Sequence, residues 1–138
     1  MSVRDLLNQA VQAENQIDAG FVINVTDSFM LNKHDVKSVK SDPILAKLKA
    51  AEGYLGHLAT LKQTIDPLGK ELDRGEMDYA LFQLTNGSLL FYFFPNLVQG
   101  KLIAVGFVSA EAEGLGQMLF WGDRYIKQIE PELRKELA

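Results

Sequence analysis

The sequence predicts a mixed α/β fold of the α+β kind, in which a five-stranded antiparallel sheet carries helices on both faces. Three observations lead to this prediction: a hairpin signal at Asn86-Gly87, two strands without polar alternation, and segments of helical periodicity on either side of them. A half-exposed strand alternates apolar and polar residues, whereas a continuous apolar run indicates that both faces of the sheet are covered. The expected order of elements is α-β-β-α-β-β-β-α.

Composition narrows the possible functions. The chain has 138 residues, which predicts a single domain over residues 1–138. Its net charge of −4 argues against a nucleic-acid partner, because such proteins need a basic face to neutralise phosphates. The absence of cysteine excludes disulfides and thiolate chemistry. Without a signal-peptide core or an apolar run of about 20 residues, we expect a cytoplasmic chain that does not insert into a membrane.

The first part of the chain begins with a helix signal. Ser2 is followed three residues later by Asp5, which resembles a capping box, and apolar residues then recur at helical spacing. We expect a helix over 3–15. The segments that follow are predicted to be a strand over 21–25, a turn over 26–28, a short strand over 29–31 and a polar loop over 32–42.

A group of lysines lies in this loop and just after it. Residues 33–49 hold five lysines against two aspartates, a net charge of +3 in an otherwise acidic chain. The group is either a solvated loop or a partner surface tuned by charge. The candidate partner-binding residues are Lys33, Lys37, Lys40, Lys47 and Lys49.

A long central helix is predicted from Pro43 to about Thr64. Asp42 before Pro43 is a favourable start, and Asp66, Pro67 and Gly69 are expected to break the helix. One face is apolar, but the opposite face is built of small residues instead of the usual charged ones. This small-residue face, interrupted only by Lys49 and His57, consists of Ala46, Ala50, Gly53, Gly56, Thr60 and Thr64. Interior glycines cost roughly 1 kcal/mol each relative to alanine, so this face either packs within the domain or allows a helix of a second subunit to approach closely.

The second half of the chain contains three predicted strands, 79–84, 88–94 and 101–108, followed by a last helix that opens near Leu115. Sequence motifs for catalysis are missing. His34 and His57 lack metal-ligand spacing, and the chain has neither a nucleophile elbow nor a phosphate loop. We therefore expect no enzyme activity, no metal and no cofactor.

The predicted order of elements resembles the roadblock family of dynein light chains and their bacterial relatives, within the wider group of profilin-like folds. The matching parts are the long helix from Pro43, the Asn86-Gly87 hairpin, and the strand over 102–108 followed by Gly114 and Leu115. One departure is that Asp27, in the turn between the first two strands, is followed by Ser28 and Phe29, whereas relatives usually carry a nearby glycine.

The resemblance implies a homodimer in which the 79–84 strands pair edge to edge and the central helices lie side by side. It also implies a non-enzymatic platform that binds a Ras-like small GTPase and modulates its nucleotide cycle or localisation. The expected dimer-interface residues are Ala46, Ala50, Gly53, Gly56, His57, Thr60, Tyr79, Leu81 and Gln83.

An alternative remains open at this stage. The aromatic run from Phe91 to Phe94 is compatible with a small-molecule sensor of the PAS-like kind, with a pocket between the sheet and a helix. The same rings would otherwise simply fill the core.

Overall fold

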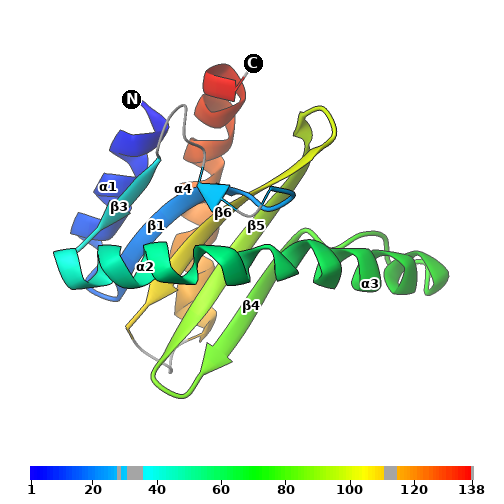
Figure 1. Ribbon diagram of the computed structural model, residues 1–138, viewed down its shortest axis with the longest axis horizontal. Helices are drawn as coiled ribbons and strands as arrows, with labels where there is room; N and C mark the ends of the chain where they lie inside the picture. The colour runs from blue at the N-terminus through cyan, green and yellow to red at the C-terminus, as the bar shows by residue number, and fades with distance from the viewer. Residues whose placement is uncertain (28, 31–35, 111–114, 138) are drawn as a thin grey trace.

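The computed structural model describes residues 1–27, 29–30, 36–110 and 115–137. Its centre is an antiparallel sheet with the strand order β2–β1–β6–β5–β4, and β3 also pairs with β1 (Figure 1). This confirms the predicted fold class, with β3 as an additional short strand. The strands are β1 (Ile17–Asn24), β2 (Phe29–Met30), β3 (Lys37–Val39), β4 (Tyr79–Leu84), β5 (Gly87–Val98) and β6 (Lys101–Ser109).

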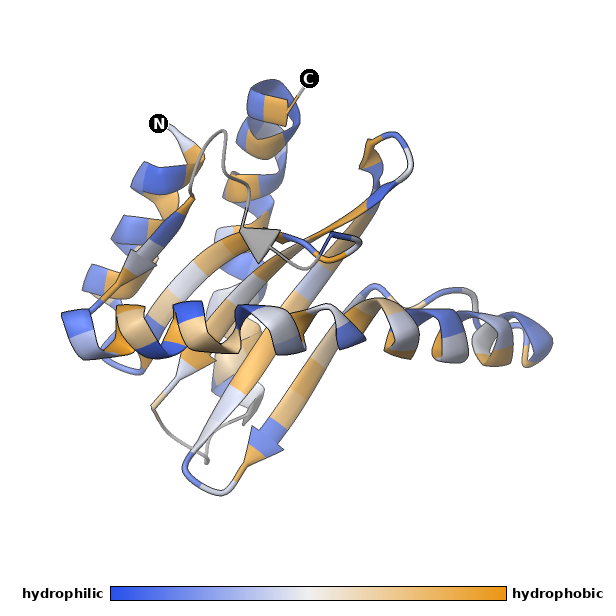
Figure 2. Ribbon diagram, viewed as in Figure 1, coloured by the Kyte–Doolittle hydropathy of each residue, from blue (hydrophilic) through white to orange (hydrophobic). Residues whose placement is uncertain are grey.

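Helices cover both faces of the sheet, as the apolar strands predicted. The helices α1 (Val3–Ala13) and α4 (Leu115–Leu137) pack on one face, and α2 (Asp42–Leu55) and α3 (His57–Glu71) cross the other (Figure 1). Colouring by hydropathy shows predominantly apolar strands between helices in which apolar and polar residues alternate (Figure 2). This is the pattern expected of helices that bury one side only.

Each face of the sheet has its own hydrophobic core. The larger core lies under α1 and α4, where Phe107 and Trp121 meet edge to face with ring centroids 5.5 Å apart. The smaller core lies under α2 and α3, and it contains Phe21, Phe91 and Leu48. Strands β1, β5 and β6 contribute to both cores, which explains why they carry almost no polar alternation.

The first helix has the predicted cap. The Ser2 hydroxyl accepts a hydrogen bond from the Asp5 backbone N–H at 3.1 Å, and the Asp5 carboxylate accepts one from the Ser2 N–H at 3.0 Å. The hydrogen bonds with Ser2 lower the pKa of Asp5. Val3, Leu7 and Val11 of this helix are fully buried in the larger core. The cap therefore stabilises the first turn of a helix that covers this core.

The first strand begins earlier than predicted, β5 ends at Val98 instead of Phe94, and the predicted loop contains an additional strand. β1 begins at Ile17 instead of Phe21, because Ile17 and Ala19 are buried and pair with β6. β3 was expected to be part of a polar loop. Its central residue, Ser38, is buried and its hydroxyl donates to the Asn8 side chain at 3.1 Å. A strand that buries a serine carries no apolar alternation, so the periodicity of the sequence missed it.

The β4–β5 hairpin is confirmed, but its chemical reason is different. Leu84 pairs with Gly87, so the loop residues are Thr85 and Asn86, and no positive φ occurs at Asn86 or Gly87. Gly87 is needed for space instead. A Cβ at this position would lie 2.5 Å from the carbonyl oxygen of Ser109 on the neighbouring strand.

The central helix is longer than predicted and is divided in two. It continues through Pro67 to Glu71, so the expectation that Asp66, Pro67 and Gly69 end it is wrong. Proline inside a helix removes one backbone hydrogen bond. Contacts between the last turns of α3 and the following loop, described below, hold this segment helical. The last helix, predicted to open near Leu115, is α4, which spans Leu115–Leu137 and continues through Pro131. Residues 111–114 before it lie outside the described residues.

Candidate interaction surface

Together α2 and α3 form an almost straight rod across the sheet (Figure 1). Gly56, between them, keeps right-handed helical dihedrals with φ −60° and ψ −24°. Leu48 on α2 and Leu58 on α3 are buried against the sheet. Because both helices bury the same side of the rod, the opposite side faces solvent along its whole length.

The small-residue face predicted from the sequence is this solvent-facing side. A Cβ placed on Gly53 would have no atom within 4 Å, so the position is open. Gly56 is half-buried at the junction of the two helices. The remaining predicted helix residues, Ala46, Ala50, Gly53, His57 and Thr60, are all exposed. Nothing in the described part of this chain therefore packs on the small-residue face.

Apolar side chains are exposed around one end of the sheet. The α3 helix continues beyond β4, the last strand, so its C-terminal half projects past the edge of the sheet (Figure 1). Seven large hydrophobic side chains of the described residues are exposed, and five of them lie on α2, α3 with its C-cap, or β4. These five are Tyr54 (77%), Leu68 (54%), Leu72 (60%), Tyr79 (45%) and Leu84 (49%). These side chains do not share one face, but they lie on the elements around the open edge of the sheet, which makes this region the candidate interaction surface.

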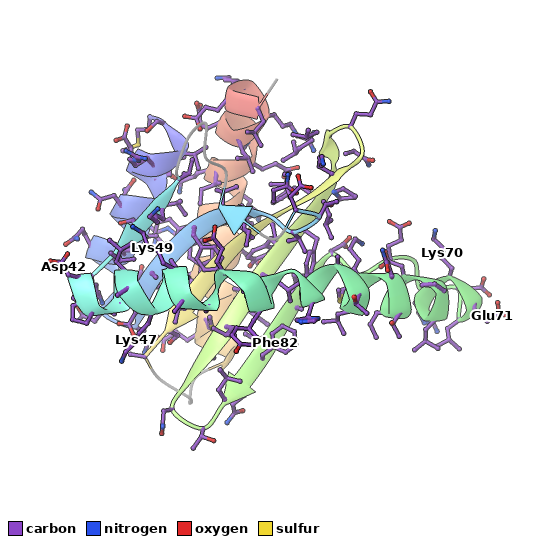
Figure 3. All side chains as sticks on the ribbon, viewed as in Figure 1. Asp42, Lys47, Lys49, Lys70, Glu71 and Phe82 are labelled. Carbon is purple, nitrogen blue, oxygen red and sulfur yellow. The ribbon has the colours of Figure 1, made fainter. Side chains whose placement is uncertain are left out.

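β4 is an edge strand with two different faces. Tyr79 and Leu81 lie on the α1/α4 side, where the rings of Tyr79 and Tyr92 pack with centroids 5.9 Å apart. Because side chains alternate along a strand, Gln83 lies on the same side. Ala80 and Phe82 lie on the α2/α3 side (Figure 3), where Phe82 joins the cluster that contains Leu58. An edge strand with no described neighbour on its outer side offers unpaired backbone groups to another chain.

A groove runs across the sheet beside α2. One hollow of about 350 Å³ lies between α2 and the sheet, and its apolar lining includes Phe21, Leu55 and Phe91. A second hollow of about 470 Å³ lies at the tip of the β4–β5 hairpin. The two hollows share the lining residues Asp18, Leu89 and Val108, so they form one continuous depression on the α2/α3 face.

Solved structures of other proteins share this arrangement. MglB from Myxococcus xanthus superimposes with a TM-score of 0.63 at 13% identity, over 96% of this chain and 92% of that one. The gliding protein MglB from Thermus thermophilus gives a TM-score of 0.65 at 14% identity, over 97% of this chain and 89% of that one. A Roadblock/LC7 domain from Streptomyces avermitilis gives a TM-score of 0.61 at 13% identity, over 96% of this chain and 98% of that one. The chain has the roadblock fold. By sequence, no family model and no curated protein matches it.

In this fold the predicted interface residues do not share one surface. The helix residues lie above the α2/α3 face of the sheet, whereas the side chains of Tyr79, Leu81 and Gln83 point to the other face. Only the backbone edge of β4 is common to both sides. Sequence analysis also missed the exposed leucines Leu68 and Leu72, because α3 was expected to end before them.

The predicted lysine group does not form a single patch. Lys47 and Lys49 are exposed on opposite sides of α2 (Figure 3). Lys40 donates hydrogen bonds to the carbonyl oxygens of Glu14 and Asn15, so it caps the C-terminal end of α1. Lys37 is half-buried on β3, and Lys33 lies outside the described residues. Of the predicted lysine group, Lys47 and Lys49 are the described members that lie exposed on α2.

The alternative sensor pocket is only partly supported. Phe91 lines the hollow beside α2, as the aromatic run suggested. Phe93 packs elsewhere in the smaller core, and Phe94 packs against the larger core on the other face. Alternation along β5 divides the aromatic run, so only Phe91 reaches the hollow beside α2. Tyr92, Phe93 and Phe94 line a separate hollow of about 300 Å³ between β5 and α4.

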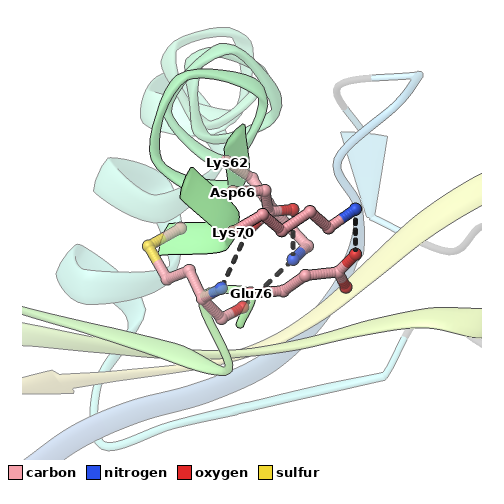
Figure 4. A network of polar contacts seen from close by, with 5 residues as sticks. Lys62, Asp66, Lys70 and Glu76 are labelled. Carbon is pink, nitrogen blue, oxygen red and sulfur yellow. Dashed lines mark hydrogen bonds and ion pairs between the residues drawn. The ribbon is translucent and has the colours of Figure 1, made fainter. Parts of the chain in front are cut away.

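A buried ion pair connects α3 to the start of β4, and it was not anticipated from the sequence. The Lys62 ammonium lies 2.8 Å from the Asp66 carboxylate and donates to the Met77 carbonyl oxygen at 3.0 Å (Figure 4). Partial burial raises the pKa of Asp66, but the hydrogen bonds from Lys62 and Met77, together with nearby lysine charges, outweigh it and lower the pKa overall.

The described residues contain no group of three or more His, Asp or Glu side chains arranged to hold a metal ion. His57 is exposed on α3, and His34 lies outside the described residues. No helix in the described ranges is both long and apolar enough to span a membrane. What the surface offers is an open strand edge, an exposed helical rod and an apolar groove, which are features of association with another macromolecule.

Proposed function

We propose that this chain is a homodimeric regulatory or scaffold protein that binds a Ras-like small GTPase and has no catalytic chemistry of its own. The observation that carries the proposal is the projection of α3 beyond β4, with exposed leucines on the projecting part. The roadblock fold supports the GTPase partner, which the resemblance to roadblock domains implies. One MglB structure with the same fold is described as having a tetrameric arrangement.

A two-fold axis beside β4 explains the exposed features together. If the β4 strands of two copies pair antiparallel, the projecting half of each α3 extends over the partner's sheet. The surface that receives it is the groove beside α2, where Leu84, Leu89 and Val108 are incompletely covered. The exposed Leu68 and Leu72 would then be buried against apolar residues, and the open strand edge would be paired.

Light scattering over a range of protein concentrations tests the dimer. We expect a mass near twice the 15.4 kDa of one chain at every concentration. Leu68→Glu should produce monomers, because a charge would enter the buried contact, while the monomer tolerates it at an exposed site. Phe120→Glu is the matched control: Phe120 is 73% exposed, lies on α4 and should leave the dimer intact. A wild-type monomer at all concentrations would exclude the homodimer.

The small-residue face has its own test. Gly53→Glu places a charge where the sequence predicts close helix pairing, and the open surroundings of Gly53 mean that the monomer accepts the side chain. We expect a weakened dimer, whereas Gly53→Ala should remain dimeric. A fully dimeric Gly53→Glu variant would show that the partner helix contacts a different side of the rod.

The GTPase partner is tested by binding and kinetics. A Ras-like GTPase loaded with GDP or with a GTP analogue is mixed with the dimer, and binding, nucleotide exchange and GTP hydrolysis are measured. We expect binding to one nucleotide state or a changed rate in one of the two reactions. No binding and unchanged rates with either nucleotide would contradict the proposal.

The second candidate function is a small-molecule sensor, favoured by the apolar hollow of about 350 Å³ between α2 and the sheet. The dimer and the sensor compete for the same groove, because the partner's α3 would fill it. Native mass spectrometry of the purified protein distinguishes them. A dimer without bound metabolite supports the platform, whereas a monomer that carries a small molecule supports the sensor.

A further inference from the structure

Lys62 is an unusual residue for the sheet-facing side of a helix. Its side chain is only 8% exposed, and its ammonium is bound by the Asp66 carboxylate and by the Met77 carbonyl oxygen. The ammonium also lies 6.0 Å from the centroid of the Phe93 ring. A buried lysine needs such partners, because an uncompensated charge is expensive to remove from water.

The Lys62–Asp66 pair binds both backbone polar groups of Met77. Asp66 accepts a hydrogen bond from the Met77 N–H at 2.8 Å, while Lys62 donates to the Met77 carbonyl (Figure 4). Met77 lies two residues before β4 begins at Tyr79. The pair therefore holds the start of the edge strand in one position against α3, much as a neighbouring strand would do.

The chain reaches Met77 through a tightly defined reversal. At the end of α3, the Asp73 N–H donates to the Lys70 carbonyl and the Arg74 N–H to the Gly69 carbonyl at 2.7 Å, with Asp73 at φ +57°. This is the Schellman pattern that ends many helices. A second ion pair, Lys70–Glu76 at 3.0 Å, is largely exposed and is expected to contribute little.

The energetics suggest a role other than stability. Replacing a buried ion pair by apolar groups of similar size is often neutral or stabilising, so the pair is weak evidence for a stabilising function. Its geometric effect is specific, because it connects two elements that both take part in the proposed dimer surface: the projecting α3 helix and the edge of β4.

We infer that Lys62 and Asp66 are positioning residues for self-association, which set the register of the β4 edge relative to the projecting half of α3. This inference rests on the proposed homodimer. In the dimer, the α3 helix must reach the partner's groove at the same time as the β4 strands pair. A β4 strand that starts in a different position against α3 satisfies one of these contacts at the expense of the other.

Lys62→Met tests this inference, because methionine keeps the length of the side chain and removes the charge. We expect the dimer dissociation constant, measured by sedimentation, to rise by about tenfold or more, equivalent to about 1.4 kcal/mol. We also expect faster amide hydrogen exchange at the start of β4. The midpoint of urea unfolding should fall in Lys62→Met, because Asp66 is left without its partner, so the double variant Lys62→Met/Asp66→Leu separates the two roles. With both charges replaced by apolar groups, the midpoint at one low protein concentration should stay the same or rise while the dimer dissociation constant still increases, whereas a purely structural role would lower stability and affinity together.

Two further variants keep the test decisive. Lys62→Gln retains a donor for the Met77 carbonyl, and it should keep more of the dimer affinity than Lys62→Met; it also serves if Lys62→Met does not fold. Lys70→Gln removes the exposed ion pair with Glu76 and should change neither the dimer dissociation constant nor the midpoint of urea unfolding. If the wild type is dimeric and the Lys62 variants have the same dimer dissociation constant as the wild type, this inference alone is overturned. A monomeric wild type overturns the proposed homodimer and this inference with it.

Discussion

Gly106→Ala should destabilise the fold, because Gly106 makes room for two aromatic rings. Gly106 lies on β6 and pairs with Phe21 on β1 and with Phe91 on β5. The two phenyl rings meet edge to face across the glycine, with centroids 6.1 Å apart. An added Cβ would lie 2.5 Å from Cζ and 2.8 Å from Cε2 of Phe21, and 2.9 Å from Cε1 of Phe91.

These distances set the expected magnitude. Carbon atoms in favourable contact are about 3.5–4.0 Å apart, so both rings must shift by about 1 Å to accept the methyl group. Overpacking of this kind costs about 1–3 kcal/mol. Replacing glycine reduces the freedom of the unfolded chain and offsets about 0.5–1 kcal/mol of that cost. We therefore expect a net loss of about 1–2 kcal/mol in the free energy of unfolding.

Gly53→Ala is the matched control, because the same methyl group is added where nothing lies within 4 Å. In the interior of α2 it should stabilise the protein by about 0.5–1 kcal/mol. Urea unfolding followed by circular dichroism measures the stability of both variants. The dependence of the unfolding free energy on urea concentration is fitted with one common slope, and the midpoints are compared at two protein concentrations. Gly106→Ala with a stability equal to or above that of the wild type would refute the description of the core around Phe21 and Phe91.

Three further outcomes are expected, each measured by unfolding in urea. Ser2→Ala removes the acceptor of the capping box and should cost about 1 kcal/mol; an unchanged midpoint would mean that this cap does not stabilise α1. Asp73→Gly relieves a positive φ at the end of α3 and should add about 0.5–1 kcal/mol, so a loss of stability would show that the Asp73 side chain has a role of its own. The lowered pKa of Asp66 means that its ionised form stabilises the folded state fully above the ordinary aspartate pKa of about 3.9 and less as pH falls below it. Stability measured between about pH 5 and pH 2 should therefore fall less steeply in Asp66→Asn than in the wild type, and identical slopes would contradict this assignment.

The parts of the fold that the sequence predicted correctly are those with strong local patterns. The β4 strand, the hairpin that follows it and the capping box at Ser2 each depend on residues within a few positions of one another. The unbroken apolar runs of β5 and β6 showed correctly that both sheet faces are covered. The α3 helix was predicted to end too early, since Pro67 is a strong local signal that contacts with the following loop overrule.

The candidate surface was predicted less completely. The small residues of the central helix were correctly expected to lie away from the sheet-facing side, because helical periodicity separates the two sides. The projecting leucines Leu68 and Leu72 were missed, because the end of a helix relative to the edge of a sheet is not a local property. The buried Lys62 gave no signal in the sequence either. A lysine four residues before an aspartate is usually a solvated surface pair on a helix.

The sequence by itself determined the order of the main elements, without β3 and without the division of the central helix, and it determined the antiparallel class of the sheet and the two-sided burial of its central strands. The edge position of β4 was expected from the resemblance to roadblock domains. Only the tertiary structure decided that α3 projects beyond this edge, and that the side chains of Tyr79, Leu81 and Gln83 lie on the opposite face from the rod. The physical reason is that hydrophobic periodicity records which side of an element is buried. It does not record which distant element does the burying, or which surfaces are left for a second chain.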